Sequence, residues 1–246
     1  MIRIAILIPT KSLPEWKNIE STFLFKHFID SFSKTYSKQY NYTIYLGYDH
    51  DDHIFTDESQ VSQLKKRVSS IQNVNLKLYK FGENQFEKGD VVSMWNFLCE
   101  EAYNNDKIND YFIQLGDDIY FNKHGWIENC INLLQKNGNL GMTGPVNING
   151  EQTILTQSMV SRKHYNIFGF YYPSEFKNWF SDTWMNKIYE PEYVYKNKEY
   201  TCINLGGDPR YEPDRVWHYS KKKDFNEIVE RDRKKIHNFI ICLNKE

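Results

Sequence analysis

The first 146 residues alternate between short apolar runs and segments that carry apolar residues at helical spacing. The apolar runs are too short for helices and end in polar or glycine-containing loops, so each one predicts a buried strand. The predicted strands cover residues 3–9, 42–48, 74–81, 111–115 and 140–146. The helical patterns between them cover residues 16–32, 61–68, 91–102 and 126–135. Strands that alternate with helices predict an α/β fold with a mostly parallel sheet flanked by helices.

The rest of the chain is less regular. Residues 156–168 predict a helix or a loop followed by a helix, and residues 169–180 are dense in aromatic side chains. A further helix begins near Asp182, and residues 193–205 predict a hairpin that turns at Asn197-Lys198. The last helix follows a capping pattern at Asp224. We therefore expect a single domain over residues 1–246, with a regular half at 1–121 and a less regular half at 122–246.

Composition narrows the class of protein. The chain has 246 residues, of which 40% are hydrophobic, so it can bury a sizeable core. A formal net charge of −1 gives no basic field, which argues against a nucleic-acid partner. No run approaches the ~20 apolar residues of a membrane-spanning helix, and the N-terminal pattern is not that of a signal peptide. The four cysteines are scattered, which favours free thiols in a reducing compartment, so we expect a cytoplasmic protein.

Two adjacent carboxylates follow the predicted strand at 111–115. Gly116 ends the apolar run, and Asp117 and Asp118 come next. Ligands of open α/β sheets bind beyond the carboxyl ends of the strands, where two neighbouring carboxylates need a cation or hydrogen-bond donors. Oxygen ligands with open positions suit Mg²⁺ or Mn²⁺ held jointly with substrate phosphates. The alternative is a solvated turn, because Gly-Asp-Asp is also typical of turns.

Several motifs together resemble the GT-A class of nucleotide-sugar glycosyltransferases, near the broad family 2 type. Ile8-Pro-Thr10 ends the first strand, and an acidic loop follows the second. Gly89 with Trp95-Asn96 is similar to the family's segment before its metal-binding strand, and Gly116-Asp-Asp118 stands in the place of its DxD motif. Phe180-Ser-Asp-Thr-Trp184 looks like the family's acidic motif on the acceptor side. The resemblance covers roughly residues 1–189 and weakens beyond them.

The resemblance implies a Rossmann-like GT-A fold and a metal-dependent transferase that uses a nucleoside diphosphate sugar, with a UDP-sugar favoured. Residues 1–121 then form the nucleotide-binding half, and residues 122–246 form the acceptor-binding half and the C-terminal helix. Because the first Asp of a DxD motif falls on Gly116, Asp118 is the expected ligand of Mn²⁺ or Mg²⁺. His218 is the expected second ligand, and packing against Trp217 or Tyr219 is its alternative. The other expected nucleotide-side residues are Pro9, Thr10, Lys11, Asp49, Asp51, Lys88, Asn96 and Asp117.

The aromatic segment and the acid that follows it are the candidates for the acceptor side. An attacking hydroxyl group must lose a proton, and Asp182 is the expected general base, with a plain helix cap as the alternative. Trp and Tyr rings offer flat apolar faces to sugars, so Tyr172, Trp179 and Trp184 are the expected acceptor-binding residues, with a place in the core as the alternative. The acceptor is expected to be a glycan or a glycosylated carrier. A base and a metal in separate halves suit a single displacement, so transfer is expected to invert.

Two other functions stay open. A sugar-nucleotide nucleotidyltransferase has a related sheet, but it requires a glycine-rich basic loop after the first strand, and residues 10–14 contain no glycine. A non-catalytic carbohydrate-binding module would keep the fold without the chemistry. Binding of a nucleoside diphosphate together with Mn²⁺ separates the module from both enzymes.

Overall fold

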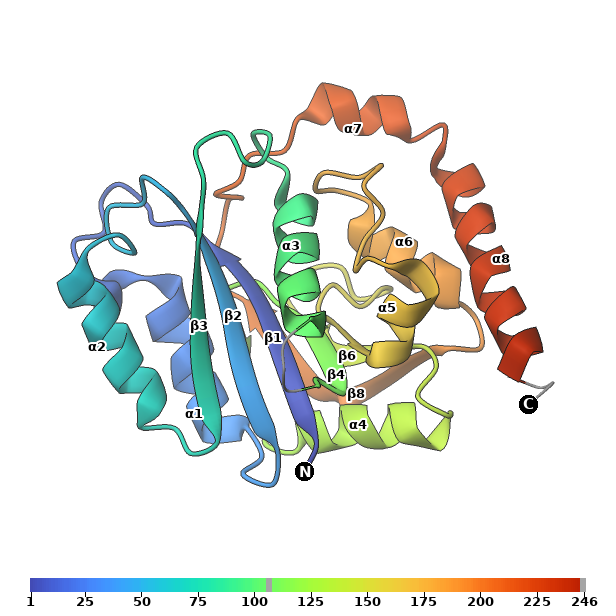
Figure 1. Ribbon diagram of the computed structural model, residues 1–246, viewed down its shortest axis with the longest axis horizontal. Coiled ribbons are helices and arrows are strands. Elements are labelled where there is room, and N and C mark those ends of the chain that lie inside the picture. The colour runs from blue at the N-terminus through green and yellow to red at the C-terminus, as the bar shows by residue number, and fades with distance from the viewer. Residues whose placement is uncertain (105–107, 244–246) are drawn as a thin grey trace.

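One eight-stranded sheet runs through the part of the chain that the structure describes, residues 1–104 and 108–243 (Figure 1). The structure is a computed structural model. The strand order is β3-β2-β1-β4-β7-β6-β8-β5. The strands are β1 (Arg3–Thr10), β2 (Asn41–Asp49), β3 (Val74–Phe81), β4 (Tyr111–Gln114), β5 (Ile119–Phe121), β6 (Met142–Asn147), β7 (Ser158–Ser161) and β8 (Val194–Asn204).

The sheet is parallel in its first half and mixed in its second. β3, β2, β1 and β4 are parallel to one another, as the alternating sequence pattern predicts. β7 is antiparallel to both β4 and β6, β8 is parallel to β6, and the short β5 is antiparallel to β8. The predicted strand at 140–146 corresponds to β6, whereas the sequence pattern does not predict β5 or β7. The expected α/β fold class is confirmed.

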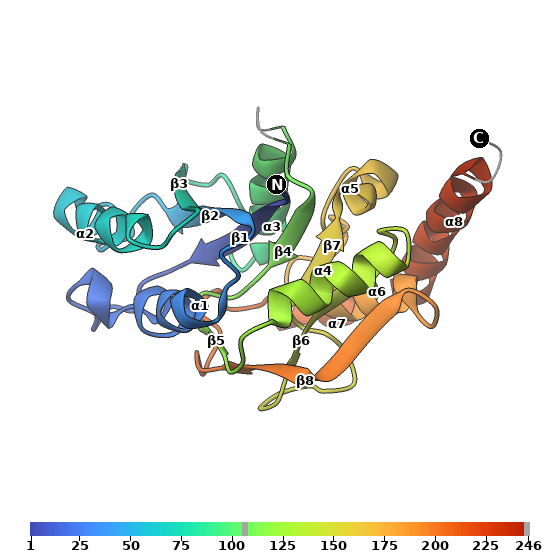
Figure 2. The ribbon, with the colours of Figure 1, turned by 90° about the horizontal axis from the view of Figure 1, so that it is seen from below.

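Helices cover both faces of the sheet (Figures 1 and 2). The side chains of β1 alternate between the faces: Ile4, Ile6 and Ile8 join a core with α1, α2 and α4, and Ala5 and Leu7 join a core with α3, α5, α6 and α8. Within the described residues, no helix is long and apolar enough to cross a membrane. The helices are η1 (Ile19–Ser21), η2 (Leu24–Ile29), α1 (Asp30–Thr35), α2 (Glu58–Ser69), α3 (Val91–Tyr103), α4 (Trp126–Lys136), α5 (Arg162–Phe168), α6 (Ser181–Tyr189), α7 (Arg215–Lys221) and α8 (Phe225–Leu243).

The predicted hairpin at residues 193–205 is wrong. β8 is one continuous strand between β6 and β5. Its pairing with β6 is irregular, because Gly144 pairs with Lys196 and Val146 pairs with Thr201. The extra residues of β8 are accommodated in this irregularity, so the Asn-Lys pair bulges within a strand instead of reversing the chain. β8 therefore carries the chain across the sheet to residues 205–214.

The carboxyl ends of β1, β2 and β4 meet at one edge of the sheet. Thr10 of β1 pairs with Tyr48 of β2, and Leu7 of β1 pairs with Gln114 of β4. The chain that leaves β4 at Gly116 therefore emerges beside the end of β1. This edge is where an open α/β sheet binds ligands.

Candidate active site

Asp117 is the buried centre of the acid pair that follows β4. It is 1% exposed, and its Oδ2 accepts a hydrogen bond of 2.6 Å from Oγ1 of Thr10 at the end of β1. Arg210 binds it from the other side: Nη1 donates to Oδ2 at 2.7 Å, and Nη2 donates to Oδ1. A planar guanidinium matches both oxygens of a carboxylate. The burial of the Asp117 charge is therefore compensated by one hydroxyl group and one cation.

Asp118 lies between two glycines beside this ion pair. A Cβ atom on Gly116 would come within 2.4 Å of its Oδ1, and one on Gly206 within 1.8 Å of its Oδ2, so a side chain at either position would displace the carboxyl group. Burial raises the pKa of Asp118 to about 6; the charge of Asp117 adds to the rise, and Arg210, with Nη2 3.9 Å from Oδ2, opposes it. The ionised form of Asp118 is thus disfavoured by its burial and by the neighbouring charge of Asp117.

A small cavity of 240 Å³, which we term the Lys11 cavity, lies where the ends of β1 and β2 meet the segment after β8. The ammonium group of Lys11 is 3.5 Å from Oδ2 of Asp49 and 5.3 Å from the centre of the Tyr211 ring. The Tyr211 hydroxyl donates to the carbonyl oxygen of Thr10 at 2.9 Å. Burial raises the pKa of Asp49, and Lys11 opposes the rise. The cavity thus presents a cation, a carboxylate and an aromatic ring to a ligand.

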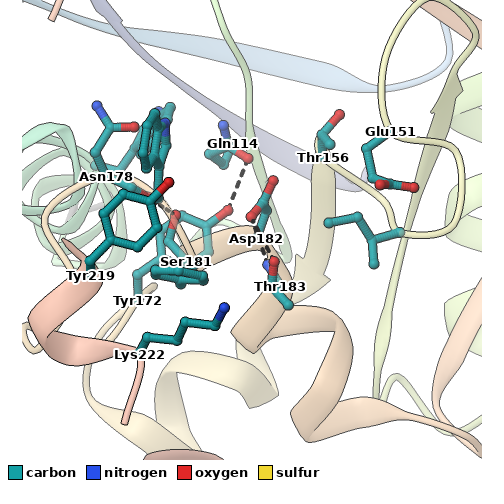
Figure 3. A pocket seen from close by; sticks show the side chains of 14 residues that line it. Gln114, Glu151, Thr156, Tyr172, Asn178, Ser181, Asp182, Thr183, Tyr219 and Lys222 are labelled. Atoms are coloured by element: carbon teal, nitrogen blue, oxygen red, sulfur yellow. Dashed lines mark hydrogen bonds between the residues drawn. The ribbon is translucent and has the colours of Figure 1, made fainter. Parts of the chain in front are cut away.

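Two larger cavities continue along the same edge. The central cavity, of 350 Å³, is lined by the acid pair, Arg210 and Tyr211. The aromatic cavity, of 510 Å³, is lined by residues of α6, α7 and the loop before α6 (Figure 3). Arg210 and Tyr211 also line the Lys11 cavity. The residues shared by the central and aromatic cavities are Trp95, Gln114, Thr156, Asn178 and Asp182. The three cavities therefore adjoin in a row, with Arg210 at one junction and Asp182 at the other.

Asp182 lies in the first turn of α6, and its carboxyl group points into the aromatic cavity in Figure 3. The helix cap is Phe180, which has a left-handed backbone with φ of 72°, so Asp182 is not the cap. Its Oδ1 accepts from the backbone N–H of Thr183 at 2.7 Å, and its Oδ2 has no hydrogen-bond partner among the described residues. Desolvation raises the pKa of Asp182 against the effect of the Thr183 bonds. An accessible carboxylate oxygen with a raised pKa suits a general base.

The three expected acceptor-side aromatics differ in depth. Trp179 lines the aromatic cavity, and its ring stacks on His218 with 5.4 Å between the ring centres. Tyr172 also lines this cavity, and its hydroxyl donates to Oε1 of Gln114 at 3.0 Å. Trp184 lines none of the three cavities: it is 0% exposed, in the core with α5 and α8. The expected acceptor contact of Trp184 is therefore corrected to a core position, because its whole ring is covered by other side chains.

Two of the expected nucleotide-side residues line a cavity as well. Pro9 lines the central cavity, and Lys88 lines the Lys11 cavity. Asp51 is exposed and lines none of the three cavities. Its neighbour Asp52 is the buried acid of this loop, and it accepts hydrogen bonds from the backbone N–H and the hydroxyl of Ser12 at 2.7 and 2.8 Å. The acidic loop after β2 therefore contributes one structural acid that sequence reasoning did not single out.

Asn96, expected on the nucleotide side, lies on α3 and lines none of the three cavities. Its Oδ1 accepts from the backbone N–H groups of Tyr171 and Tyr172 at 3.0 and 2.9 Å, and its Nδ2 donates to the carbonyl oxygen of Tyr172 at 2.8 Å. All of these bonds fix the backbone of the aromatic segment. Asn96 therefore shapes the aromatic cavity from behind, and we correct its expected contact with the nucleotide.

His218 does not share a cavity with Asp118. It is fully buried in α7, where its ring packs on Trp179 and meets the edge of Trp217 with 5.4 Å between ring centres. Neither ring nitrogen has a hydrogen-bond partner among the described residues. Burial lowers the pKa of His218, which keeps the ring neutral. The packing alternative is thus the arrangement observed for His218.

The acid pair fits a divalent cation only together with a ligand that brings its own oxygens. No group of three or more His, Cys, Asp or Glu side chains within residues 1–104 and 108–243 could hold a metal ion. Mg²⁺ is commonly held by one or two carboxylates plus substrate phosphates. Asp118 supplies one such carboxylate, whereas both oxygens of Asp117 are already bonded.

Solved structures of S. aureus TarS share this fold. TarS residues 1–349 match 83% of the chain with a TM-score of 0.55 at 12% sequence identity. Their complex with UDP matches 82% at a TM-score of 0.53 and 11% identity, and their complex with UDP-GlcNAc matches 94% at 0.58 and 10% identity. The chain spans 60% of the first two TarS chains and 66% of the third. No family model and no curated protein matches the sequence. The likeness shows a shared fold and agrees with the expected α/β fold class, but it does not distinguish the family 2 type.

Proposed function

We propose that this protein is a glycosyltransferase that moves a sugar from a nucleoside diphosphate sugar, with a UDP-sugar favoured, to a hydroxyl group of a glycan or glycosylated acceptor. One observation carries the proposal: Asp182 lies at the junction of the aromatic and central cavities, and the acid pair lines the same central cavity. Sugar transfer needs this order of acceptor, base and charged donor site. The shared fold supports it, since TarS has been crystallised with UDP and with UDP-GlcNAc.

In this proposal each of the three cavities takes one part of the substrates. The Lys11 cavity takes the base and ribose, where Asp49 accepts a hydrogen bond from the N3–H of a uracil-type base. The central cavity takes the diphosphate and the sugar. The aromatic cavity takes the acceptor, and Trp179 covers an apolar face of its sugar.

Asp118 is the residue that would hold Mn²⁺ or Mg²⁺ together with the donor diphosphate. Such a cation would supply Lewis-acid stabilisation to the diphosphate leaving group. Two features of Asp118 support this role: it lines the central cavity, and burial together with the charge of Asp117 raises its pKa to about 6, so a cation beside it would favour its ionised form. His218 is not part of the proposed site, because it lines none of the three cavities.

Asp182 is the proposed general base that accepts the proton of the attacking hydroxyl group. As the acceptor oxygen bonds to the anomeric carbon, its proton passes to Asp182, and the bond between the anomeric carbon and the diphosphate oxygen breaks. The acceptor arrives from the aromatic cavity and the diphosphate departs within the central cavity. Attack and departure on opposite sides of the sugar make a single displacement with inversion the proposed stereochemical course.

Nucleotide binding tests the proposal directly. A ligand that binds only the folded protein stabilises it by about 2.7 kcal/mol at 100 times its Kd. We expect UDP and UDP-sugars to raise the melting temperature, and more so with Mn²⁺ than with EDTA. The sugar nucleotide with the largest shift is then incubated with glycan acceptors, and the product is analysed for the new glycosidic bond and its anomeric configuration. If no nucleoside diphosphate sugar shifts the melting temperature, the proposed function is wrong.

A further inference from the structure

Arg210 is the cationic side chain that is bound to the acid pair. Its guanidinium bonds both oxygens of Asp117, lies 3.9 Å from Oδ2 of Asp118, and donates to the carbonyl oxygen of Lys11 at 2.8 Å. The side chain is 11% exposed and packs near the rings of Trp16 and Phe23. It is thus held in place by charge, hydrogen bonds and ring contacts together.

The central cavity holds more carboxylates than cationic side chains. Among its described lining residues are four aspartates, at positions 117, 118, 182 and 208, and a single cationic side chain, that of Arg210. A diphosphate entering this cavity would meet repulsion from the acid pair unless a cation faced it. A guanidinium presents the same two-point geometry to a phosphate as to a carboxylate. Arg210 is therefore already beside the place where a diphosphate needs a donor.

The backbone around Arg210 is fixed independently of the ion pair. The N–H of Leu205 donates to the carbonyl oxygen of Asp118 at 3.0 Å, and the Tyr211 hydroxyl donates to the carbonyl oxygen of Thr10 at 2.9 Å. Nδ2 of Asn178 also donates to the carbonyl oxygen of Tyr211 at 3.2 Å. These bonds do not involve the guanidinium, so the side chain can change partner while the segment stays attached.

We propose that Arg210 is a resident counter-ion that binds Asp117 in the donor-free protein and turns to the donor's diphosphate when it enters the central cavity. This inference rests on the proposed function. Thr10 keeps its hydrogen bond to Asp117 after the exchange, and the released Oδ1 is free for a ribose hydroxyl or a metal-bound water. The donor-free protein therefore has little affinity for a divalent cation alone, since Arg210 occupies the same acid pair.

Two binding measurements on Arg210→Ala have opposite expected signs. UDP affinity in EDTA should fall about 10- to 100-fold, the loss expected for a hydrogen bond to a charged group. Affinity for Mn²⁺ without nucleotide should rise, because the acid pair loses its counter-ion. Arg210→Lys keeps the positive charge but lacks the planar guanidinium that bonds two oxygens at once, so it should retain part of the UDP affinity and stay folded. If the ion pair between Arg210 and Asp117 were only structural, Arg210→Ala would lower the melting temperature but would not change the UDP and Mn²⁺ affinities in opposite directions.

Arg231→Ala is the matched control. Arg231 donates to Oδ2 of the buried Asp232 at 2.8 Å and lines none of the three cavities. Its removal should change neither affinity. If the wild type binds UDP and both Arg210 variants bind it equally well in EDTA, or if Mn²⁺ affinity does not rise in Arg210→Ala, the inference is overturned. If the wild type binds no nucleoside diphosphate at all, the proposed function fails first.

Discussion

The donor edge and the acceptor side of this site are built by opposite means. At the donor edge, polar groups from distant segments pair with one another, so that Thr10, Asp117 and Arg210 form one buried cluster. On the acceptor side, the aromatic rings differ in burial: Trp184 is 0% exposed, whereas Trp179 lines the aromatic cavity. A change at the donor edge should therefore remove one specific interaction, whereas a change on the acceptor side should cost stability according to depth.

The largest effect is expected where the two regions meet. Asp182→Asn keeps the shape of the side chain but removes the base, so turnover should fall by about 10²–10⁴-fold while donor affinity is unchanged. Sugar-transfer rates and donor titrations on the same preparation measure both quantities. Asp51→Asn alters an exposed aspartate that lines none of the three cavities and serves as the control. Near-normal turnover of Asp182→Asn would exclude a role as base.

The pH dependence of the wild type extends this prediction. Desolvation raises the pKa of Asp182, and only the ionised carboxylate accepts a proton. Activity should therefore fall as the pH is lowered through this raised pKa, and protonation of Asp118, whose pKa is raised to about 6, should add to the same acidic limb of the pH profile. A limb at the ordinary aspartate pKa would contradict the desolvated setting of this group.

Trp184→Ala tests the fully buried part of the acceptor side. The substitution empties a fully buried site and removes the hydrogen bond of 3.2 Å from Nε1 to Oδ2 of Asp232. Loss of a core aromatic ring typically costs about 3–5 kcal/mol of unfolding free energy. Chemical denaturation monitored by circular dichroism gives the value. A loss below about 1 kcal/mol would place Trp184 outside the core and would restore it as a candidate for acceptor binding.

The sequence predicts the donor edge well where it depends on local periodicity. The apolar runs of β1 and β4 are visible without a structure because both faces of these strands are buried. A strand end is then easy to locate, so the sequence predicts Thr10, Asp117 and Asp118 as site residues. The shared fold confirms the architecture that these patterns predict.

Arg210 escapes sequence reasoning because it is 93 positions from Asp117 in a segment with no periodic pattern. The close approach of Gly206 to Asp118 likewise follows only from the path of β8. Asn96 and Trp184 illustrate a second limit. A polar or aromatic residue in a family-like motif can contact a ligand or hold the backbone, and only tertiary packing distinguishes the two.

His164, in the core behind the aromatic cavity, should make stability depend on pH. Its Nε2–H donates to the carbonyl oxygen of Tyr171, and its Nδ1 accepts from the Tyr189 hydroxyl, each at 2.9 Å. Burial lowers the pKa of His164 from 6.5 to about 4. The unfolded chain then binds the proton first, so stability is full above pH 6.5 and declines as the pH falls toward 4, by about 3 kcal/mol in total.

Denaturation curves across this pH range check the His164 prediction. His164→Gln removes the titrating group, so its stability should change less between pH 6.5 and pH 4 than that of the wild type. The comparison uses the slope with pH, because the substitution also alters the stability at neutral pH. Equal slopes in the two proteins would show that another group causes the acid sensitivity.

At the donor edge, Thr10→Val should cost less than the deep acceptor-side changes. It preserves the shape of the buried side chain but removes the hydroxyl that donates to Asp117 at 2.6 Å. A buried acceptor that loses one donor typically costs about 1–3 kcal/mol, and Arg210 remains to limit the loss. Thr10→Ser keeps the hydroxyl and is the control for unfolding measurements. Equal stabilities of the Val and Ser variants would mean that this bond contributes nothing.

The smallest change in stability is expected for Trp179→Ala, at the rim of the aromatic cavity. The ring is partly exposed, so its removal should cost about 1 kcal/mol or less, while the Michaelis constant for the acceptor rises and donor affinity is unchanged. The ring also covers His218, so NMR titration should show the pKa of His218 rising from its lowered value as water gains access. A stability loss as large as that of Trp184→Ala would assign Trp179 to the core. If a stable Trp179→Ala variant kept the same acceptor kinetics, Trp179 would only cover His218. Another residue at the rim of the aromatic cavity would then have to contact the acceptor.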